Sequence, residues 1–113
     1  MVKTLTGIKM KVGLTEEEFI RYWEEKHGPL FSKIVPGVRR YVQCHPVKVP
    51  GIENEFDGIA EVWWDDLESY KNYFMNWRPS EEGKVLREDE KKFIDTSQMV
   101  RFVAEEKVII DNS

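Results

Sequence analysis

The sequence has one cysteine, two histidines and no long apolar run. Cys44 has no second cysteine with which to form a disulfide inside the chain. The start, MVKTLTGIKMKV, lacks the apolar core of a secretory signal, so we expect a cytoplasmic protein. No apolar stretch approaches the roughly 20 residues that span a bilayer. We therefore expect no membrane partner.

The sequence also lacks an excess of basic charge. Its 17 Lys and Arg residues stand against 21 Asp and Glu residues, for a net charge of -4 at pH 7. Nucleic-acid binding is disfavoured because it relies on a basic patch or stripe. The histidines and the cysteine do not have the spacing of a structural zinc site, and the glycines do not have the spacing of a phosphate-binding loop. At 113 residues, we expect a single domain over residues 1–113.

What the sequence does have is a regular alternation of predicted elements. Strand patterns cover residues 2–12, 38–45, 57–64 and 100–110. One helix is predicted to begin at the capping box of Thr15 and Glu18, and a second after Asp65, followed by a short helical stretch over 80–93. This order matches the α+β, ferredoxin-like β-α-β-β-α-β fold, an antiparallel four-stranded sheet with helices on one face.

The strand patterns also predict which side chains face the helices. In the second strand we assign Val38, Val42 and Cys44 to the buried side and Tyr41, Gln43 and His45 to the other. The uncovered face of the sheet then mixes apolar and charged residues, including Val103 and Arg101 of the last strand. A face of this kind suits a subunit contact, so we expect a homodimer.

Several segments taken together resemble the EthD-type proteins of the dimeric α/β-barrel superfamily. The segments are GLTEEEFIRYWEEKHGPL, PGVRRYV, DGIAEVWWDD, SEEGKVLREDEKKFID and VAEE. The resemblance covers roughly residues 3 to 108. It implies a ferredoxin-like protomer that forms a homodimeric eight-stranded barrel, as a rule with no metal or organic cofactor. It implies no single reaction, since such proteins include an ether-degradation accessory protein and fungal polyketide dehydratases and decarboxylases.

His27 is the main candidate for activity. Helical spacing places it on the same side as Phe19 and Trp23, facing the sheet. Pro29 disfavours helical geometry at Gly28, so we expect the helix to end after His27 and a pocket to open there. From the residues alone, His27 is either a general acid/base or a core histidine bonded to a carbonyl at the helix end. The resemblance favours activity, because His27 falls on the family's H-(A/G)-P-L element.

Asp57 is the second catalytic candidate, since it opens the third strand and could orient or charge a nearby imidazole. Its alternative is an ordinary turn role in the Asp57-Gly58 pair. Trp23, Phe31 and Trp64 lie near the predicted helix end. They are either core residues or the walls of a substrate pocket for a small hydrophobic or aromatic ligand.

The sequence also gives expectations for three further residues and one loop. We expect Glu61 to pair with Arg39, Arg101 or Lys9 across the sheet, and His45 to lie on a solvent or dimer face. Cys44 is expected to be a small buried core residue. Residues 46–56 make a loop longer than a hairpin needs, and we expect this loop to close the pocket.

The predicted function is a cofactor-independent lyase or isomerase, dehydratase- or cyclase-like, that acts on an aromatic or polyketide-like small molecule with His27 as general acid/base. One alternative is a non-catalytic accessory protein that binds a small hydrophobic ligand. The other is a small quinol-type oxygenase or haem-binding protein, with His27 or His45 as axial ligand.

Overall fold

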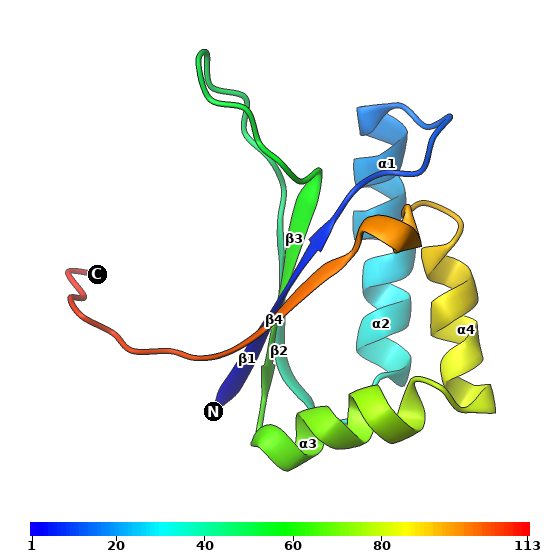
Figure 1. Cartoon of the computed structure of the whole chain (residues 1–113), viewed down its shortest axis with the longest axis vertical. Coiled ribbons are helices and arrows are strands. Elements are labelled where there is room, and N and C mark those ends of the chain that lie inside the picture. The colour runs from blue at the N-terminus through cyan, green and yellow to red at the C-terminus, as the bar shows by residue number, and fades with distance from the viewer.

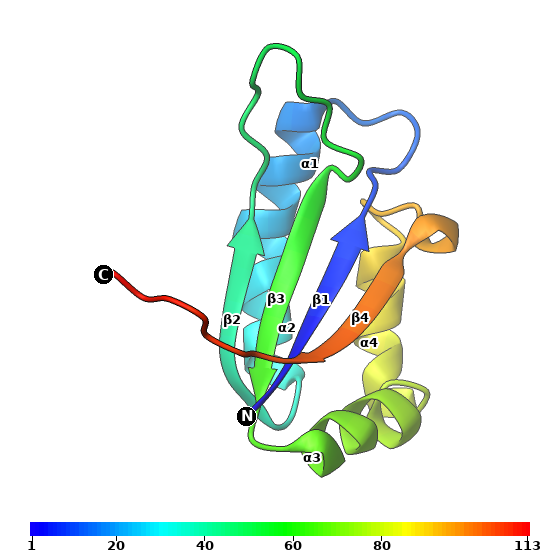
Figure 2. The same ribbon diagram turned by 60° about the vertical axis from the view of Figure 1, so that its left-hand side comes forward.

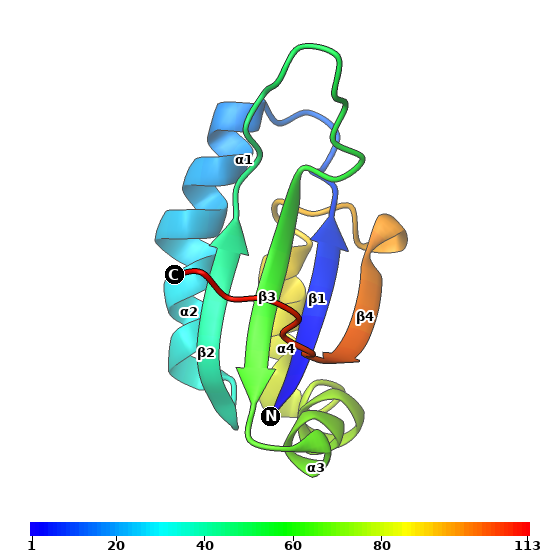
Figure 3. The same cartoon turned by 90° about the vertical axis from the view of Figure 1, so that its left-hand side faces the viewer.

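The four strands form one antiparallel sheet in the order β2-β3-β1-β4. A computed structural model describes all 113 residues of the chain. The strands are β1 (Val2–Ile8), β2 (Val38–Cys44), β3 (Gly58–Trp64) and β4 (Val100–Glu105). They lie side by side in Figures 2 and 3, and the helices cover only one face of the sheet in Figure 1. The predicted α+β, ferredoxin-like fold is confirmed.

The helical layer consists of three helical segments and a short 3-10 turn. The first is continuous and comprises α1 (Glu16–Tyr22), a π-helical turn η1 (Trp23–His27) and α2 (Gly28–Ile34). The second comprises α3 (Leu67–Lys71) and a π-helical turn η2 (Asn72–Trp77), and it lies at the end of the sheet opposite α1 (Figure 1). α4 (Glu81–Glu90) and a 3-10 turn, η3 (Thr96–Gln98), lead back to β4.

The helix starts follow from local side-chain capping. The hydroxyl of Thr15 accepts from the backbone N–H of Glu18 at 3.1 Å, and the Glu18 carboxylate accepts from the N–H of Thr15 at 3.0 Å. The predicted capping box is therefore confirmed. At α3 the N-cap is Asp66, which accepts from the N–H of Ser69 at 2.8 Å. Asp65, the predicted cap, instead forms an ion pair with Arg39.

Two predicted strands were too long. β1 ends at Ile8 rather than at residue 12, and β4 ends at Glu105 rather than at residue 110. Residues 106–113 leave the sheet and extend away from its open face (Figures 1 and 3). The apolar Val108, Ile109 and Ile110 in this tail are exposed, so their apolar character did not indicate a strand.

The predicted facing of β2 was wrong because of a β-bulge. The register with β3 shifts between Val38 and Arg40, and a shift of one residue turns every later side chain to the opposite face. Tyr41 packs on the ring of Phe31, with centroids 4.7 Å apart, and so faces the helices. Gln43 and His45 share its face, whereas Cys44 is exposed on the other side and is not a buried core residue.

The facing of β4 also differs from the prediction. Arg101 pairs with Thr6 and Val103 pairs with Thr4, and Thr4 is buried beneath the helices. Partners in an antiparallel pair project to the same face, so Arg101 and Val103 lie on the helix side. Their neighbour Phe102 lies on the open face and is 64% exposed.

The open face of the sheet is mixed, as predicted, but is composed of different residues. Lys3 forms an ion pair with Glu61 at 3.1 Å, so none of the predicted partners of Glu61 is the one it has. Lys3 and Arg40 also lie over the ring of Trp63, at 4.7 and 4.5 Å from its centroid. Between these groups the face carries apolar side chains, namely Leu5, Val42, Ile59 and Phe102.

The core between sheet and helices has two clusters. One contains Phe31, Val35, Val62, Trp64, Tyr73 and Leu86, and the other contains Ile8, Phe19, Trp23, Phe93 and Ile94. No helix of the structure is long and apolar enough to cross a membrane.

Candidate functional site

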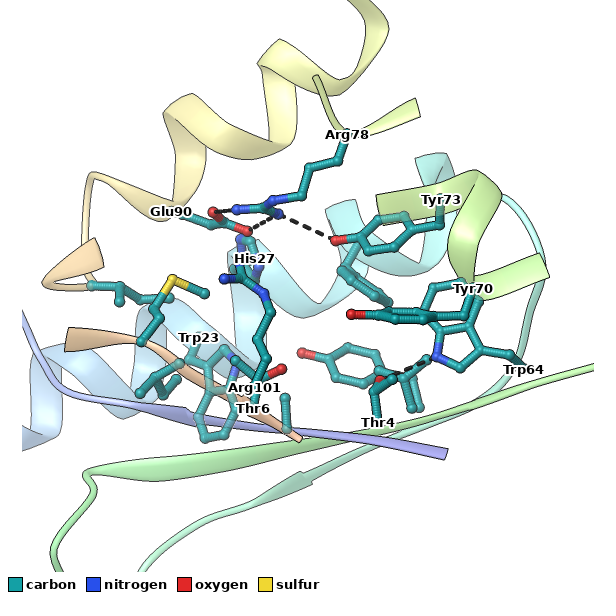
Figure 4. A pocket seen from close by; sticks show the side chains of 17 residues that line it. Thr4, Thr6, Trp23, His27, Trp64, Tyr70, Tyr73, Arg78, Glu90 and Arg101 are labelled. Atoms are coloured by element: carbon teal, nitrogen blue, oxygen red, sulfur yellow. Dashed lines mark hydrogen bonds and ion pairs between the residues drawn. The ribbon is translucent and has the colours of Figure 1, made fainter. Parts of the chain in front are cut away.

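A cavity lies between the sheet and the helices, where the two core clusters meet. Its volume is about 60 Å³. His27, Trp23 and Trp64 line it (Figure 4), and so does Phe31. The structure thus brings together the predicted general acid/base and all the predicted aromatic wall residues. Trp23 and Phe31 come from the long first helix, and Trp64 comes from β3.

The helix does not end at His27, contrary to the prediction. His27 is the last residue of η1, and the N–H of Gly28 donates to the carbonyl of Trp23, five residues earlier. Pro29 follows in the first turn of α2, and it has no N–H to donate to a carbonyl of the preceding turn. The wider π turn accommodates the proline and directs His27 toward the sheet.

His27 forms a buried pair with Asp89 of α4. The Nδ1 atom of His27 lies 2.8 Å from Oδ2 of Asp89, and the two residues are 5% and 8% exposed. The other carboxylate oxygen, Oδ1, accepts from the hydroxyl of Tyr22 at 2.5 Å. A carboxylate accepts and does not donate, so the proton of a neutral His27 ring resides on Nδ1. This leaves the lone pair of the other ring nitrogen, Nε2, free.

The Nε2 atom of His27 is the unpartnered ring nitrogen of a residue that lines the cavity. The only hydrogen bond of His27 in the structure is made through Nδ1. No buried side-chain nitrogen or oxygen lacks a partner, so Nε2 is not sealed within the core. It can accept a proton from a ligand in the cavity and return it.

Asp57 does not lie with His27, and the prediction that it orients the imidazole is corrected. Its Oδ2 atom accepts from the backbone N–H of Met10 at 2.7 Å, which fastens the start of β3 to the chain just after β1. Asp89 takes the orienting position instead. Its sequence signal was its spacing: Asp89 falls three residues after Leu86 and four before Phe93, within an apolar helical stripe.

A second buried polar pair, which the sequence analysis missed, borders the same cavity. The guanidinium of Arg78 donates to both carboxylate oxygens of Glu90, with Nη1 2.7 Å from Oε2. Nη1 also lies 3.2 Å from the hydroxyl of Tyr73. Burial acts to lower the pKa of Arg78, but the hydrogen bonds and charge of Glu90 outweigh it and raise that pKa. The pair therefore stays ionised and has no net charge.

Three tyrosines contribute neutral polar groups to the cavity. Burial raises the pKa of Tyr41, Tyr70 and Tyr73, so each ring keeps its phenolic proton at neutral pH. The hydroxyl of Tyr41 accepts from Nε2 of Gln43 at 2.9 Å. Phenol groups of this kind can donate hydrogen bonds to a ligand oxygen.

The cavity has room for only a few water molecules in this conformation. A ligand the size of an aromatic ring therefore requires side chains at its border to move. Met99 and the exposed Arg101, on either side of the start of β4, are lining residues that can do so.

The loop over residues 46–56 does not close the cavity, contrary to the prediction. None of its residues lines the cavity. The loop projects beyond the end of the sheet (Figures 2 and 3) and borders a separate cleft beside α1. His45, predicted on a solvent or dimer face, packs on the helix side with its ring 5.1 Å from that of Trp23. No three His, Cys, Asp or Glu side chains are grouped as metal ligands would be.

The comparisons with known proteins agree with this architecture. The family model described as the EthD domain matches residues 11–97. An ethyl tert-butyl ether D (EthD) family protein from Bacillus halodurans is 27% identical, with a TM-score of 0.72 over 95% of this chain and 99% of that chain. An EthD-like protein from Ralstonia eutropha is 15% identical, with a TM-score of 0.67 over 99% of this chain and 95% of that chain.

A third similar structure is described as a dimeric protein of unknown function with a ferredoxin-like fold, from Bacteroides fragilis. It is 15% identical, with a TM-score of 0.63 over 93% of this chain and 95% of that chain. At this identity the likeness concerns the fold alone. No curated protein matches the sequence.

Proposed function

The chain belongs to the EthD family, and we propose that it is a cofactor-independent lyase or isomerase in which His27 moves protons on an aromatic or polyketide-like small molecule. One observation carries the proposal: Asp89 holds Nδ1 of His27 while Nε2 is free at a cavity. A histidine held in this way has the fixed tautomer and ring orientation that a general base requires.

The proposed chemistry needs only the residues of the chain. In a dehydration, Nε2 of His27 takes a proton from the carbon next to a ligand carbonyl, and the electron pair of that C–H bond moves toward the carbonyl oxygen to give an enolate. The enolate then re-forms the carbonyl and makes a carbon–carbon double bond as the C–O bond of the hydroxyl on the next carbon breaks. The imidazolium gives its proton to that hydroxyl, which leaves as water. The Asp89 carboxylate stabilises the imidazolium between the two steps.

The surroundings of His27 support a flat, partly polar ligand. Trp23, Phe31 and Trp64 supply apolar ring faces, and the phenols of Tyr41 and Tyr73 supply donors for an oxygen that gains negative charge as the proton leaves. Aromatic walls with a few placed polar groups are typical of small-molecule sites.

We further propose that the protein acts as a homodimer in the cytoplasm, with the open faces of two sheets packed together as an α/β barrel. The exposed apolar side chains of that face and the dimeric relative from Bacteroides fragilis support the pairing.

Proton abstraction can be tested before the natural substrate is identified. A panel of aryl ketones and aromatic hydroxyketones is incubated with the protein in heavy water, and deuterium uptake and water loss are read by mass spectrometry. We expect His27→Gln and Asp89→Asn to fold, and to slow exchange on the order of 10²- to 10⁴-fold. Asp65→Asn, which changes an exposed aspartate, is the matched control and should exchange at the wild-type rate.

The result distinguishes the catalytic role from the alternatives. A folded His27→Gln variant that exchanges at the wild-type rate would falsify the catalytic role of this residue. A wild-type protein that binds these compounds but catalyses neither exchange nor water loss would favour the accessory, ligand-binding alternative.

A further inference from the structure

The cavity has one ionisable group that no residue of the chain neutralises. Apart from tyrosines, its ionisable lining residues are His27, Arg78, Glu90 and Arg101. Glu90 is fully engaged, because Arg78 binds both of its carboxylate oxygens. His27 has its own acid, Asp89. The side chain of Arg101 forms no ion pair and no hydrogen bond within the chain, and its guanidinium lies over the ring of Phe74.

Arg101 is placed to contact a bound ligand. It lies opposite Thr6 in the sheet, on the face that the helices cover. Figure 4 shows its side chain reaching from β4 into the cavity rather than away from it. The residue is exposed, so it stands at the border between the cavity and solvent, where an incoming ligand first meets the protein.

The contact with Phe74 leaves the guanidinium N–H donors of Arg101 available to a ligand. The guanidinium carbon lies 5.3 Å from the centroid of the Phe74 ring. A cation held over a ring in this way is attracted by the ring face, so the contact does not use its N–H donors. The planar fork of N–H groups matches the two oxygens of a carboxylate.

We propose that the ligand of the cavity is an aromatic carboxylate and that Arg101 binds its charged group. The inference rests on the proposed function only in assuming that an aromatic ring enters the cavity. The Arg78 and Glu90 pair is neutral, and the carboxylate of Asp89 does not line the cavity and has the ammonium of Lys92 at 3.8 Å. Arg101 therefore sets the sign of the charge that the cavity prefers. The ligand's ring then lies among Trp23, Phe31 and Trp64, with its carboxylate at the border.

A matched pair of probes tests the inference. The probes are 4-hydroxybenzoate and 4-hydroxybenzamide, which share size and shape and differ in charge. Each is titrated at neutral pH into ¹⁵N-labelled protein and followed by backbone and indole NMR shifts. We expect the wild type to bind the benzoate roughly tenfold more tightly than the amide, because a hydrogen-bonded charge contributes about that factor. The preference should shrink as salt is added.

The variants separate a binding role of Arg101 from a structural one. Arg101→Gln should lose the preference and bind the amide as the wild type does, whereas Arg101→Lys should retain part of it. Arg21→Gln is the control, because Arg21 is an exposed arginine paired with Glu17 on the surface of α1. It removes the same charge and should keep the full preference.

The outcomes that overturn the inference are distinct from failure of the proposed function. Equal affinity of the wild type for both probes, or equal preference in Arg101→Gln, overturns the role of Arg101 and leaves the aromatic site standing. A loss of affinity for both probes in Arg101→Gln assigns the residue to structure rather than charge recognition, and also overturns it. If neither probe shifts any resonance of a cavity residue, the aromatic site itself fails, and the inference fails with it.

Discussion

Asp89 is the residue on which the site depends most. Its buried carboxylate would be costly without partners, and it accepts from Tyr22 and from His27, with the ammonium of Lys92 at 3.8 Å. One acid on α4 thereby fixes two side chains of the long first helix. Removing it would leave both without a partner. The prediction that Asp89→Asn slows proton transfer therefore concerns orientation as well as charge.

Tyr22 provides a test of this arrangement through pH. Burial, together with the hydrogen bond and charge of Asp89, raises the pKa of Tyr22 to about 12 from its ordinary value of 10. Because the folded pKa is the higher one, the stabilisation is complete below pH 10 and is lost as the pH rises toward 12. We expect Tyr22→Phe to remove this loss, which is on the order of 1 kcal/mol for a partly exposed ring.

The measurement is urea unfolding of the wild type and of Tyr22→Phe at several pH values across that range. Other tyrosines also ionise there, so only the difference between the two curves is diagnostic. Unfolding free energies that fall in parallel from pH 10 to 12 would contradict a special environment for Tyr22.

At the residue scale, the sequence predicted where the His27 side chain lies better than it predicted which side chain pairs with it. Helical spacing placed His27 on the buried face, and the structure puts it at a cavity beside Trp23, Phe31 and Trp64. Their functional roles remain predictions. The partner was missed because Asp89 is 62 residues away in the chain. The packing of α4 on the first helix decides that pairing, and no local pattern encodes it.

At the scale of elements, two π turns shape the helical layer. η1 ends at His27, two residues before Pro29, and η2 ends at Trp77, two residues before Pro79. A proline ring clashes with the carbonyl four residues earlier in a regular helix, and a wider turn moves that carbonyl aside. The rule that proline ends a helix therefore held after η2 but not after η1, where α2 continues and buries Phe31.

The close packing of Gly28, at the junction of η1 and α2, against Gln43 of β2 leads to a prediction about stability. A Cβ atom on Gly28 would lie 2.8 Å from Nε2 of Gln43 and 3.1 Å from the carbonyl oxygen of Trp23. Gly28→Ala should therefore displace the Gln43 amide, which donates to that carbonyl at 2.9 Å. We expect a loss of about 1 to 2 kcal/mol in the free energy of unfolding.

A double-mutant cycle isolates the cause. Gly28 has ordinary right-handed helical geometry, with φ -56° and ψ -53°, so alanine is otherwise preferred there by about 1 kcal/mol. In a Gln43→Ala background, Gly28→Ala should be neutral or stabilising. If Gly28→Ala costs the same in both backgrounds, contact with Gln43 is not what requires glycine.

The strands show how a single inserted residue limits prediction from sequence. Alternation located all four strands, but in β2 it assigned the wrong face because the bulge between Val38 and Arg40 cannot be recognised from residue types. The error mattered for function. With the bulge, Tyr41 turns from the open face into the cavity and Cys44 turns out of the core.

At the scale of the whole molecule, one layer of helices covers one face of a sheet, and the other face stays open (Figure 1). The cavity lies on the covered side, between the two core clusters, so pairing through the open face leaves each His27 within its own protomer. The sequence predicted a mixed uncovered face correctly, although the bulge in β2 and the facing of β4 changed which residues compose it.

Pairing through the open face is tested by a charge placed on that face. Phe102 lies on the edge strand β4, pairs with Leu5 of β1 on that face and is 64% exposed in the single chain. In a dimer built from two open faces, Phe102→Glu would bury a carboxylate without a partner, which costs several kcal/mol. Light scattering of the wild type should give twice the 13.4 kDa of one chain, and Phe102→Glu should give one chain at the same micromolar concentration.

The matched control is Met75→Glu. Met75 is also 64% exposed, but it lies on η2, in the helical layer. The Met75→Glu variant adds the same charge to an equally exposed apolar site outside the proposed interface. Its mass in light scattering should therefore equal that of the wild type. If both variants dissociate, the charge acts non-specifically; if neither does, or if the wild type is already a single chain, the open face is not where two chains meet. Because the cavity is lined by residues of one chain, a monomeric Phe102→Glu should still show the benzoate preference of the wild type.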